Sequence, residues 1–331
     1  MIHTEKYSTD LRNRGIDLAN RKILVTRFFN SNQEKDLEKP PNCNGFGRIH
    51  HFKRFISDNW PINPLPTDPA CKALNISAPE ILKVQLFQNA ICSWRCWYCF
   101  VDEKLKVGNR KYSDFKSTDE LIELYLNESE IIPIIDISGG QPDLVPEWTL
   151  WFMKSLEKRN LQNKIYLWSD DNLSNDYISK YLSKESIKFM SDYKNYGRVG
   201  CFKGFDKASF TFNTRANPDY FNLQFIYAKK MSELFDFYGY ITLTHNSDYN
   251  LYKRINDFID LIQEKIHPLF PLRVIPLKII QFTPNLKRIK ENQEKALSIQ
   301  NIAVEAWKEE LSSRFTIAEL NKPIYEHEIT L

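Results

Sequence analysis

The stretch "ILKVQLFQNAICSWRCWYCF" (Ile81 to Phe100) joins an apolar run to a group of cysteines. The run "ILKVQLF" has the length and composition of a buried β-strand. Cys92, Cys96 and Cys99 follow it with the spacing C-x3-C-x2-C and precede a helical pattern. In parallel βα folds, the loops that follow the strands build the active site. The stretch therefore predicts a strand that delivers thiols to a functional position.

The rest of the chain alternates strand-like runs with helical patterns. Helices are predicted to begin at Pro146 and Pro218, because proline fits the first helical turn. A long amphipathic helix is predicted after Pro284. The strand-like runs are "ILKVQLF" from Ile81, "IIPIIDIS" from Ile131, "KIYLWS" from Lys164, "RVGCFKG" from Arg198, "YGYITLT" from Tyr238 and "RVIPLKIIQF" from Arg273. This alternation predicts an α/β fold with a parallel sheet, in the form of a partial (βα)6 TIM-like barrel.

The chain divides into three predicted regions. Residues 1–80 contain "KPPNCNGFG" and "NWPINPLPTDPACKALN", which are rich in Pro and Asn and show little periodicity. We expect them to form an irregular N-terminal extension packed on the barrel. Residues 81–285 are the predicted barrel core, and residues 286–331 are a C-terminal helical segment.

Composition narrows the class of protein. The 331 residues are 42% hydrophobic and 26% charged, which is ordinary for a globular protein. The net charge of +3 is too small to indicate binding to nucleic acid or a membrane, which usually requires a concentrated basic patch. No run reaches the roughly 18 apolar residues of a membrane span, and the polar N-terminus lacks a signal-peptide core. We expect a cytoplasmic protein whose six cysteines are free or metal-bound rather than paired in disulfides.

The cysteine-rich loop has three interpretations. Three buried structural cysteines are the simplest, because free cysteine is often buried. A structural zinc site is the second, although such sites use four Cys or His ligands and the nearest upstream histidines are His50 and His51. An iron–sulfur cluster with three thiolates is the third. A fully ligated four-iron cluster takes four cysteines, so three would leave one iron open, as catalytic metal sites require.

Two motifs resemble those of radical S-adenosylmethionine (SAM) enzymes. "CSWRCWYC" is similar to the family's C-x3-C-x-aromatic-C signature, with Tyr98 at the aromatic position. "ISGGQP" (Ile137 to Pro142), at the end of the next predicted strand, resembles the Gly-Gly-Glu-Pro segment that contacts the SAM amino group. By this resemblance Cys92, Cys96 and Cys99 hold a 4Fe-4S cluster. Gly139 and Gly140 let backbone carbonyls approach SAM. Gln141 stands where glutamate is usual and lacks its charge.

The same resemblance implies further SAM-binding residues. "LWSDDN" ends the third predicted strand, and its Ser169, Asp171 and Asn172 take positions near the bound SAM. Lys203, in "KGFD" after the fourth strand, is a candidate partner for the SAM carboxylate, with a solvent-facing lysine as the alternative. Tyr98 resembles the residue beside the adenine.

Aromatic side chains accompany the thiols. Trp94, Trp97 and Phe100 either shield the cluster or simply pack in the core.

The resemblance implies a radical SAM enzyme. One electron from the reduced cluster cleaves SAM to a 5′-deoxyadenosyl radical, which abstracts hydrogen from a small molecule, nucleotide or peptide. An electron donor such as flavodoxin or ferredoxin is then a partner. One alternative is an activase that installs a glycyl radical on a partner protein, to which "KG-x-D" is similar. The other is a non-catalytic metal-binding protein. Whether SAM is a co-substrate or is regenerated stays open.

The substrate is not identified by the sequence. No cysteine follows Cys201, so a C-terminal auxiliary-cluster extension is absent from this sequence. Cys43, Cys71 and Cys201 are either buried singly or form a second metal site.

The extension is the expected source of substrate specificity. In it "GRIHHFKRF" (Gly47 to Phe55) is either a nucleotide- or phosphate-binding segment or a solvated basic edge. His50, His51 and His245 are candidate polar or acid–base groups, with a structural role as the alternative.

Overall fold

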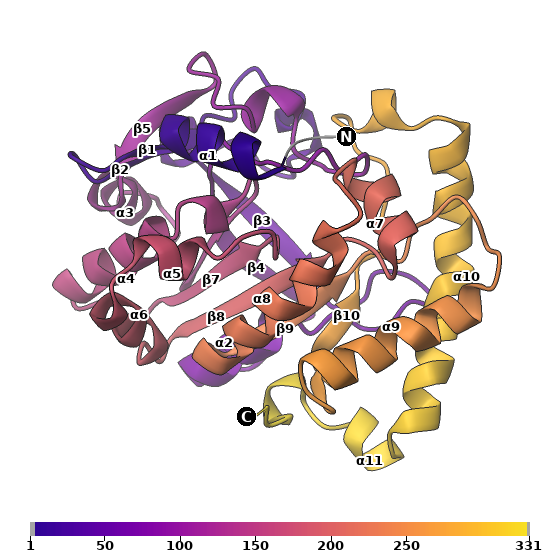
Figure 1. Ribbon diagram of the computed structural model, residues 1–331. Coiled ribbons are helices and arrows are strands. Elements are labelled where there is room, and N and C mark those ends of the chain that lie inside the picture. The colour runs from indigo at the N-terminus through magenta and orange to yellow at the C-terminus, as the bar shows by residue number, and fades with distance from the viewer. Residues whose placement is uncertain (1–3, 330–331) are drawn as a thin grey trace.

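The computed structural model describes residues 4–329 and is built around a curled seven-stranded sheet (Figure 1). The strand order is β10-β9-β8-β7-β6-β4-β3. Strands β4, β6, β7, β8, β9 and β10 pair in parallel with their neighbours, and β3 pairs antiparallel with β4 at one edge. The bounds are β3 (Gly47–Lys53), β4 (Ile81–Gln88), β6 (Ile134–Ser138), β7 (Tyr166–Asp171), β8 (Tyr196–Phe202), β9 (Phe237–Ile241) and β10 (Val274–Pro276). The predicted α/β class and open, barrel-like sheet are confirmed.

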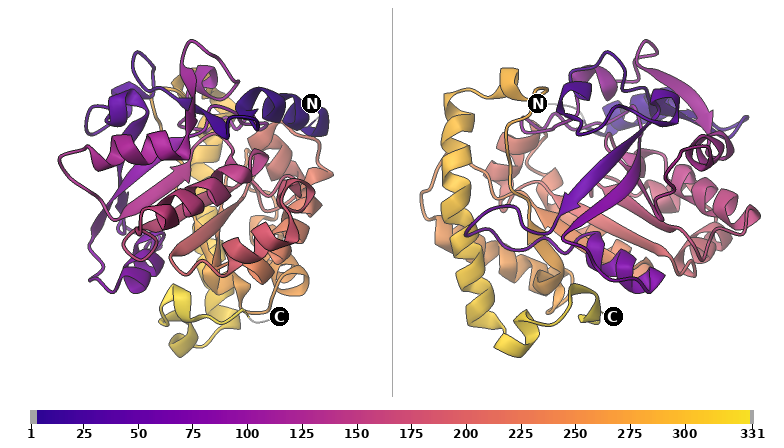
Figure 2. Two further views of the ribbon diagram at one scale, coloured as in Figure 1. Left: turned by 90° about the vertical axis from the view of Figure 1, so that its left-hand side faces the viewer. Right: turned by 180° about the vertical axis from the view of Figure 1, so that it is seen from behind.

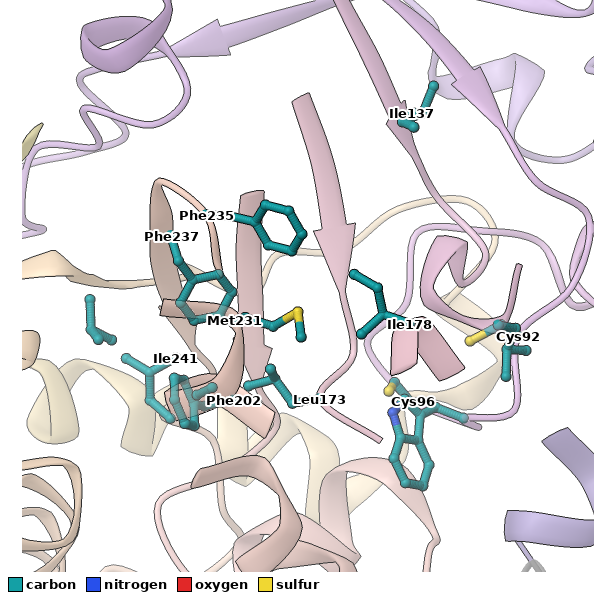
Figure 3. Close-up of a cluster of buried hydrophobic side chains, with 14 of the residues drawn as sticks. Cys92, Cys96, Ile137, Leu173, Ile178, Phe202, Met231, Phe235, Phe237 and Ile241 are labelled. Atoms are coloured by element: carbon teal, nitrogen blue, oxygen red, sulfur yellow. The ribbon is translucent and has the colours of Figure 1, made fainter. Parts of the chain in front are cut away.

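The two faces of the sheet carry different side chains. Strand residues alternate between faces, so Ile135 and Ile137 of β6 join the larger hydrophobic cluster under the helices, whereas Ile134 joins a second cluster on the concave face. Figure 3 shows Ile137 on the helix side together with Ile178 and Met231. The helices of this layer are α3 (Thr118–Leu126), α4 (Glu147–Lys158), α5 (Tyr177–Tyr181), α6 (Lys184–Ser191), α8 (Tyr220–Leu234) and α9 (Leu251–Lys265).

Local signals explain several helix boundaries. Ser117 caps α3 through a reciprocal pair of hydrogen bonds with Glu120. Helix α4 begins at Glu147, one residue after the predicted helix start at Pro146. The strand predicted from Arg273 onwards is shorter in the structure, where β10 has only three residues. It ends at Pro276, which has no N–H to donate to a neighbouring strand.

The N-terminal extension is more regular than the prediction. It contains α1 (Thr4–Gly15), β1 (Ile16–Asp17), β2 (Lys22–Thr26), β3 and α2 (Thr67–Leu74). Strands β1 and β2 form a small antiparallel sheet with β5 (Ser113–Ser117). Sheet pairing therefore crosses residue 80, both through β2 with β5 and through β3 with β4. The sequence does not signal β3 as a strand, because polar residues such as Arg48, His50 and His51 interrupt its apolar ones.

The C-terminal segment packs beside the edge of the sheet that ends with β10. Its helix α10 (Glu291–Arg314) packs along α9 and is followed by α11 (Ile317–Leu320). The predicted start after Pro284 is too early, because residues 286–288 form a 3-10 turn. Seen from behind in Figure 2, the segment between β3 and α2 runs beside α10. There Trp60 Nε1 donates to the Pro276 carbonyl over 2.9 Å. Within residues 4–329, no helix combines the length and apolarity needed to cross a membrane.

Candidate functional site

The three clustered cysteines lie on one loop, residues 89–108, which we call the cysteine loop. It follows β4, at the edge where the parallel strands end. Cys92 and Cys96 are buried at the edge of the larger hydrophobic cluster (Figure 3), and Cys99 is partly exposed. The Cys92 N–H donates to the Lys106 carbonyl over 2.9 Å, which joins the two ends of the loop. All three are free thiols.

The thiols are close enough to affect one another electrostatically. Burial, opposed by Lys106 and reinforced by the neighbouring Cys96 and Cys99, raises the pKa of Cys92 to about 12. Within the part of the chain that the structure describes, no group of three or more His, Cys, Asp or Glu side chains is placed to hold a metal ion.

Buried lysines face the thiols. Lys106 is 1% exposed and pairs with Glu103 over 2.9 Å; burial opposes its charge, but Cys99 and Glu103 outweigh burial and raise its pKa. Lys203 is also buried, and within residues 4–329 its ammonium has no hydrogen bond or ion pair. Burial likewise opposes its charge, but Cys201, Tyr98 and the loop thiols raise its pKa. Both lysines act to lower the pKa of Cys96 against the effect of burial, so their charge would stabilise an anionic group such as a thiolate-bound cluster.

The C-terminal segment holds the cysteine loop from outside. The Arg288 guanidinium donates to the Cys96 carbonyl over 3.0 Å and also to the Cys99 carbonyl. Asn285 Nδ2 donates to the Tyr98 carbonyl over 3.0 Å. These carbonyls belong to the loop backbone, so the contacts hold the part of the loop that carries Cys96 and Cys99. The sequence gives no signal for either residue, because they lie 187 and 192 residues away from their partners along the chain.

A second anchor comes from α7 (Lys207–Thr214). The Asn213 side chain accepts from Trp97 Nε1 over 2.9 Å and donates to the carbonyls of Lys203 and Thr244 over 2.9 and 3.1 Å. It therefore ties the cysteine loop to the ends of β8 and β9. Trp94 is 1% exposed and packs edge-on against Phe210.

The aromatic side chains of the cysteine loop differ in how deeply they are buried. Trp94 and Trp97 are part of the packed core, whereas Phe100 is 36% exposed.

The "GGQP" loop is locked to the end of β4. Gly139 and Gly140 have φ of 65° and 62°, which favours glycine. A Cβ at Gly140 would come within 2.3 Å of the Asn89 carbonyl oxygen. The Asn89 side chain accepts from the Gln141 N–H over 3.0 Å and donates to the Gln141 carbonyl over 2.9 Å. The glycines are therefore required by this close packing, whatever ligand the loop binds.

The Gln141 side chain is fully engaged within the protein. It is 0% exposed, and Oε1 accepts from the Ser93 N–H and hydroxyl over 2.8 and 2.7 Å. Its Nε2 donates to Asp143 over 2.9 Å and to Ser174 over 2.6 Å. Gln141 thus positions the cysteine loop and has no free group for SAM. An amide suits this position better than a carboxylate, because the side chain must donate a hydrogen bond to Asp143 and also accept from Ser93.

Gln141→Glu is expected to destabilise the protein by about 1–3 kcal/mol at pH 8, because it removes the donors and sets a carboxylate beside Asp143. Burial already raises the pKa of Asp143 to about 6, and nearby Asp171 contributes. A folded-state pKa above the unfolded value of about 4 gives stability that is present at low pH and lost as pH rises. The deficit should therefore shrink as pH falls from 8 towards 5. Urea unfolding across this range measures it.

The double variant Gln141→Glu/Asp143→Asn is the matched control for this prediction. It restores one donor and one acceptor to the pair, so much of the lost stability should return at pH 8. An equal deficit in the single and double variants at pH 8 would show that the carboxylate pair is not the cause.

Two predicted SAM-binding residues of β7 face the helices. The Ser169 hydroxyl lies 2.7 Å from the Tyr196 hydroxyl. Asp171 forms a buried ion pair with Arg198, in which Oδ2 accepts from the guanidinium over 2.5 and 3.1 Å. Both residues alternate with the concave-facing side chains of the strand. The structure therefore does not bring them together with the thiols.

Three other predicted residues do meet near the cysteine loop. Asn172 Nδ2 lies 3.6 Å from Cys92 Sγ. The Tyr98 hydroxyl accepts from Thr242 over 3.1 Å, and Lys203 is close enough to Tyr98 to be influenced by it. These side chains come from the loop and from the ends of β7, β8 and β9, so they share the edge at which the thiols lie.

The "KG-x-D" segment has a structural explanation. Asp206 caps α7 through a reciprocal pair of hydrogen bonds with Ser209. A Cβ at Gly204 would come within 2.5 Å of the Phe210 backbone nitrogen. The motif is therefore accounted for by the start of a helix packed closely on the strand end.

The remaining cysteines lie in separate places. Cys43 belongs to the larger hydrophobic cluster, and its N–H donates to Glu128 over 2.7 Å. Cys71 lies on α2 in the concave-face cluster, against which Cys201 of β8 packs. Within the described chain these three cysteines do not form a metal-binding group.

Two of the candidate histidines have local partners. His51 pairs with Glu38 over 2.6 Å, and His245 Nδ1 accepts from the Ser247 N–H over 3.1 Å. Burial lowers the pKa of His245. Neither histidine contacts the cysteine loop through these interactions.

Comparison with known proteins gives distant structural similarity. No protein-family model and no curated protein matches the sequence. SuiB of Streptococcus suis bound to S-adenosylmethionine is similar over 53% of this chain and 36% of the SuiB chain, with 20% identity and a TM-score of 0.36. A second SuiB structure matches over 54% and 36%, with 18% identity and a TM-score of 0.35. This chain thus spans little more than a third of the length of the SuiB chains.

Proposed function

We propose that this protein is a radical SAM enzyme with a partial (βα)6 barrel of that family's type. One observation supports it above the others. The cysteine loop after β4 and the "GGQP" loop after β6 are bonded to each other through Asn89 and Gln141. Two sequence motifs that resemble one family thereby become a single structural unit at the ends of neighbouring parallel strands.

The residues at this unit suit a cluster and SAM. Cys92, Cys96 and Cys99 would hold a 4Fe-4S cluster, and the buried Lys106 would offset its negative charge. The buried ammonium of Lys203, which has no ion pair among residues 4–329, would meet the SAM carboxylate. When bound, the cluster and SAM supply one-electron cleavage of SAM and a radical that abstracts hydrogen from the substrate.

Other side chains would complete the site. Tyr98 would lie along the adenine, Asn172 beside Cys92, and the Gly139 and Gly140 carbonyls near the SAM amino group. The packed Trp94 and Trp97 would keep water from the thiols, which a radical reaction requires. Gln141, Ser169 and Asp171 are assigned to positioning and stability instead.

We further infer that the electron donor, a flavodoxin- or ferredoxin-type protein, approaches the Cys99 side of the loop. Cys99 is more exposed than Cys92 and Cys96, and its neighbour Phe100 is 36% exposed. Exposed aromatic surface beside a redox centre is a reasonable contact for a transient partner.

Anaerobic reconstitution with iron and sulfide tests the proposed function. We expect about four iron atoms per chain and, after reduction with dithionite, conversion of SAM to methionine and 5′-deoxyadenosine. Liquid chromatography with mass spectrometry measures both products. Stoichiometric zinc with no 5′-deoxyadenosine would instead support the non-catalytic metal-binding alternative. Radical formation on a co-expressed glycyl-radical protein would support the activase alternative.

A further inference from the structure

One carboxylate on the cysteine loop faces three cations. Glu103 opens a short 3-10 turn, Glu103–Leu105, and its side chain is 44% exposed. It pairs with Lys106 over 2.9 Å, with Arg288 over 3.0 Å and with Arg95 over 3.9 Å. Among residues 4–329, none of these cations pairs with a second carboxylate. Around Glu103, positive charge therefore exceeds negative charge.

Lys106 lies deepest of the three cations. Its side chain is 1% exposed, against 14% and 22% for the two arginines. Its carbonyl accepts from the Cys92 N–H over 2.9 Å and its neighbour Val107 pairs with Ile91, so the end of the loop lies along the segment that carries the first thiol. Burial raises the pKa of Cys92 and of Cys96, and Lys106 acts against burial at both thiols. The ammonium is therefore close enough to act on negative charge at the thiols.

The ion pair with Glu103 cancels only part of this effect. Water reaches the half-exposed carboxylate and screens its charge, whereas the Lys106 ammonium is enclosed. Stability alone does not explain a lysine in this place, because taking an ammonium out of water costs more than a half-exposed partner usually returns. The arrangement is suited instead to holding a positive charge beside the thiols.

We propose that Lys106 and Glu103 set the reduction potential of the cluster on the cysteine loop in opposite directions, the lysine raising it and the glutamate lowering it. The inference rests on the proposed function, because it requires a cluster on these thiols. Reduction moves one electron from the donor to the cluster, which gains one negative charge, and no bond forms or breaks. A buried positive charge nearby stabilises the reduced form, and a negative charge destabilises it.

A redox titration of the reconstituted full-length protein tests this assignment. Dithionite supplies the electrons in the absence of SAM, and electron paramagnetic resonance measures the reduced cluster. In Lys106→Met the equilibrium constant for reduction should fall at least about tenfold, which lowers the potential by about 59 mV or more for a one-electron couple. In Glu103→Gln the potential should rise, by a smaller amount because water screens the half-exposed charge.

The same loop offers a matched control. Lys104 carries the same charge as Lys106 but is exposed, so Lys104→Met should keep the wild-type potential. The double variant Glu103→Gln/Lys106→Met loses one charge of each sign, so its potential should lie between those of the two single variants.

The sign of the shifts separates this role from a structural one. If Lys106 and Glu103 only hold the loop, both single variants would lose iron or melt at a lower temperature, and the cluster that remains would keep the wild-type potential. Unchanged potentials, or shifts of the same sign in both single variants, overturn the assignment. If Lys106→Met binds no iron, Glu103→Gln alone decides, and an unchanged or lower potential in that variant overturns the assignment.

SAM cleavage is assayed in the same preparations. Opposite shifts of the potential without any 5′-deoxyadenosine would keep this role for the two side chains and reject the proposed function. SAM cleavage with the same potential in every variant would do the reverse. A wild-type protein that assembles no iron–sulfur cluster would reject both.

Discussion

Replacing Cys92, Cys96 or Cys99 with alanine is expected to abolish SAM cleavage and most iron binding. Each thiol would supply one ligand, and the buried loop offers no other free cysteine beside them. Changes in the surroundings of a metal site alone reduce affinity or activity by about 10–100-fold, so loss of a ligand should exceed about 100-fold. Iron content, visible absorbance and 5′-deoxyadenosine yield measure the effect.

Cys43→Ala is the matched control for these variants. Cys43 is buried, as Cys92 and Cys96 are, but its N–H donates to Glu128 and it is not part of the cysteine loop. It should retain iron and SAM cleavage. If Cys43→Ala loses the cluster, or if Cys99→Ala keeps both iron and activity, then the three-cysteine assignment is wrong.

The strands were predictable from sequence because their apolar runs are continuous. A parallel strand is buried on both faces, so runs such as the one from Ile81 stand out against their surroundings. The edge strand β3 could not be found in the same way. Its concave-facing residues include Arg48 and His50, and only its pairing with β4 makes "GRIHHFK" a strand.

Only the parts of the site that lie in short, contiguous sequence motifs were predictable. The cysteine loop and "GGQP" are short, contiguous signals. Strand alternation could have separated Asp170, which faces the concave side, from Ser169 and Asp171, which face the helices. Arg288 carries no comparable signal, because its role depends on how the C-terminal segment folds back over the loop carbonyls.

Asp171→Asn is expected to lower the free energy of unfolding by about 3–5 kcal/mol, because it leaves Arg198 charged and unpaired inside the protein. The side chains of this ion pair are 5% and 2% exposed, and Arg198 Nε and a terminal nitrogen both donate to Asp171 Oδ2. Asparagine keeps an oxygen for the Leu173 N–H, so the change isolates the loss of charge. Urea unfolding measures it.

The matched control is the exposed ion pair between Asp176 and Lys230, whose nitrogen and oxygen lie 2.7 Å apart. Its side chains are 42% and 32% exposed, so Asp176→Asn should change stability by no more than about 1 kcal/mol. The two assignments of Asp171 then predict opposite results. If it bound SAM, Asp171→Asn would weaken SAM binding and leave stability near the wild-type value. If it serves Arg198, stability falls and the double variant Asp171→Leu/Arg198→Met recovers much of it, since an apolar pair can replace a buried ion pair.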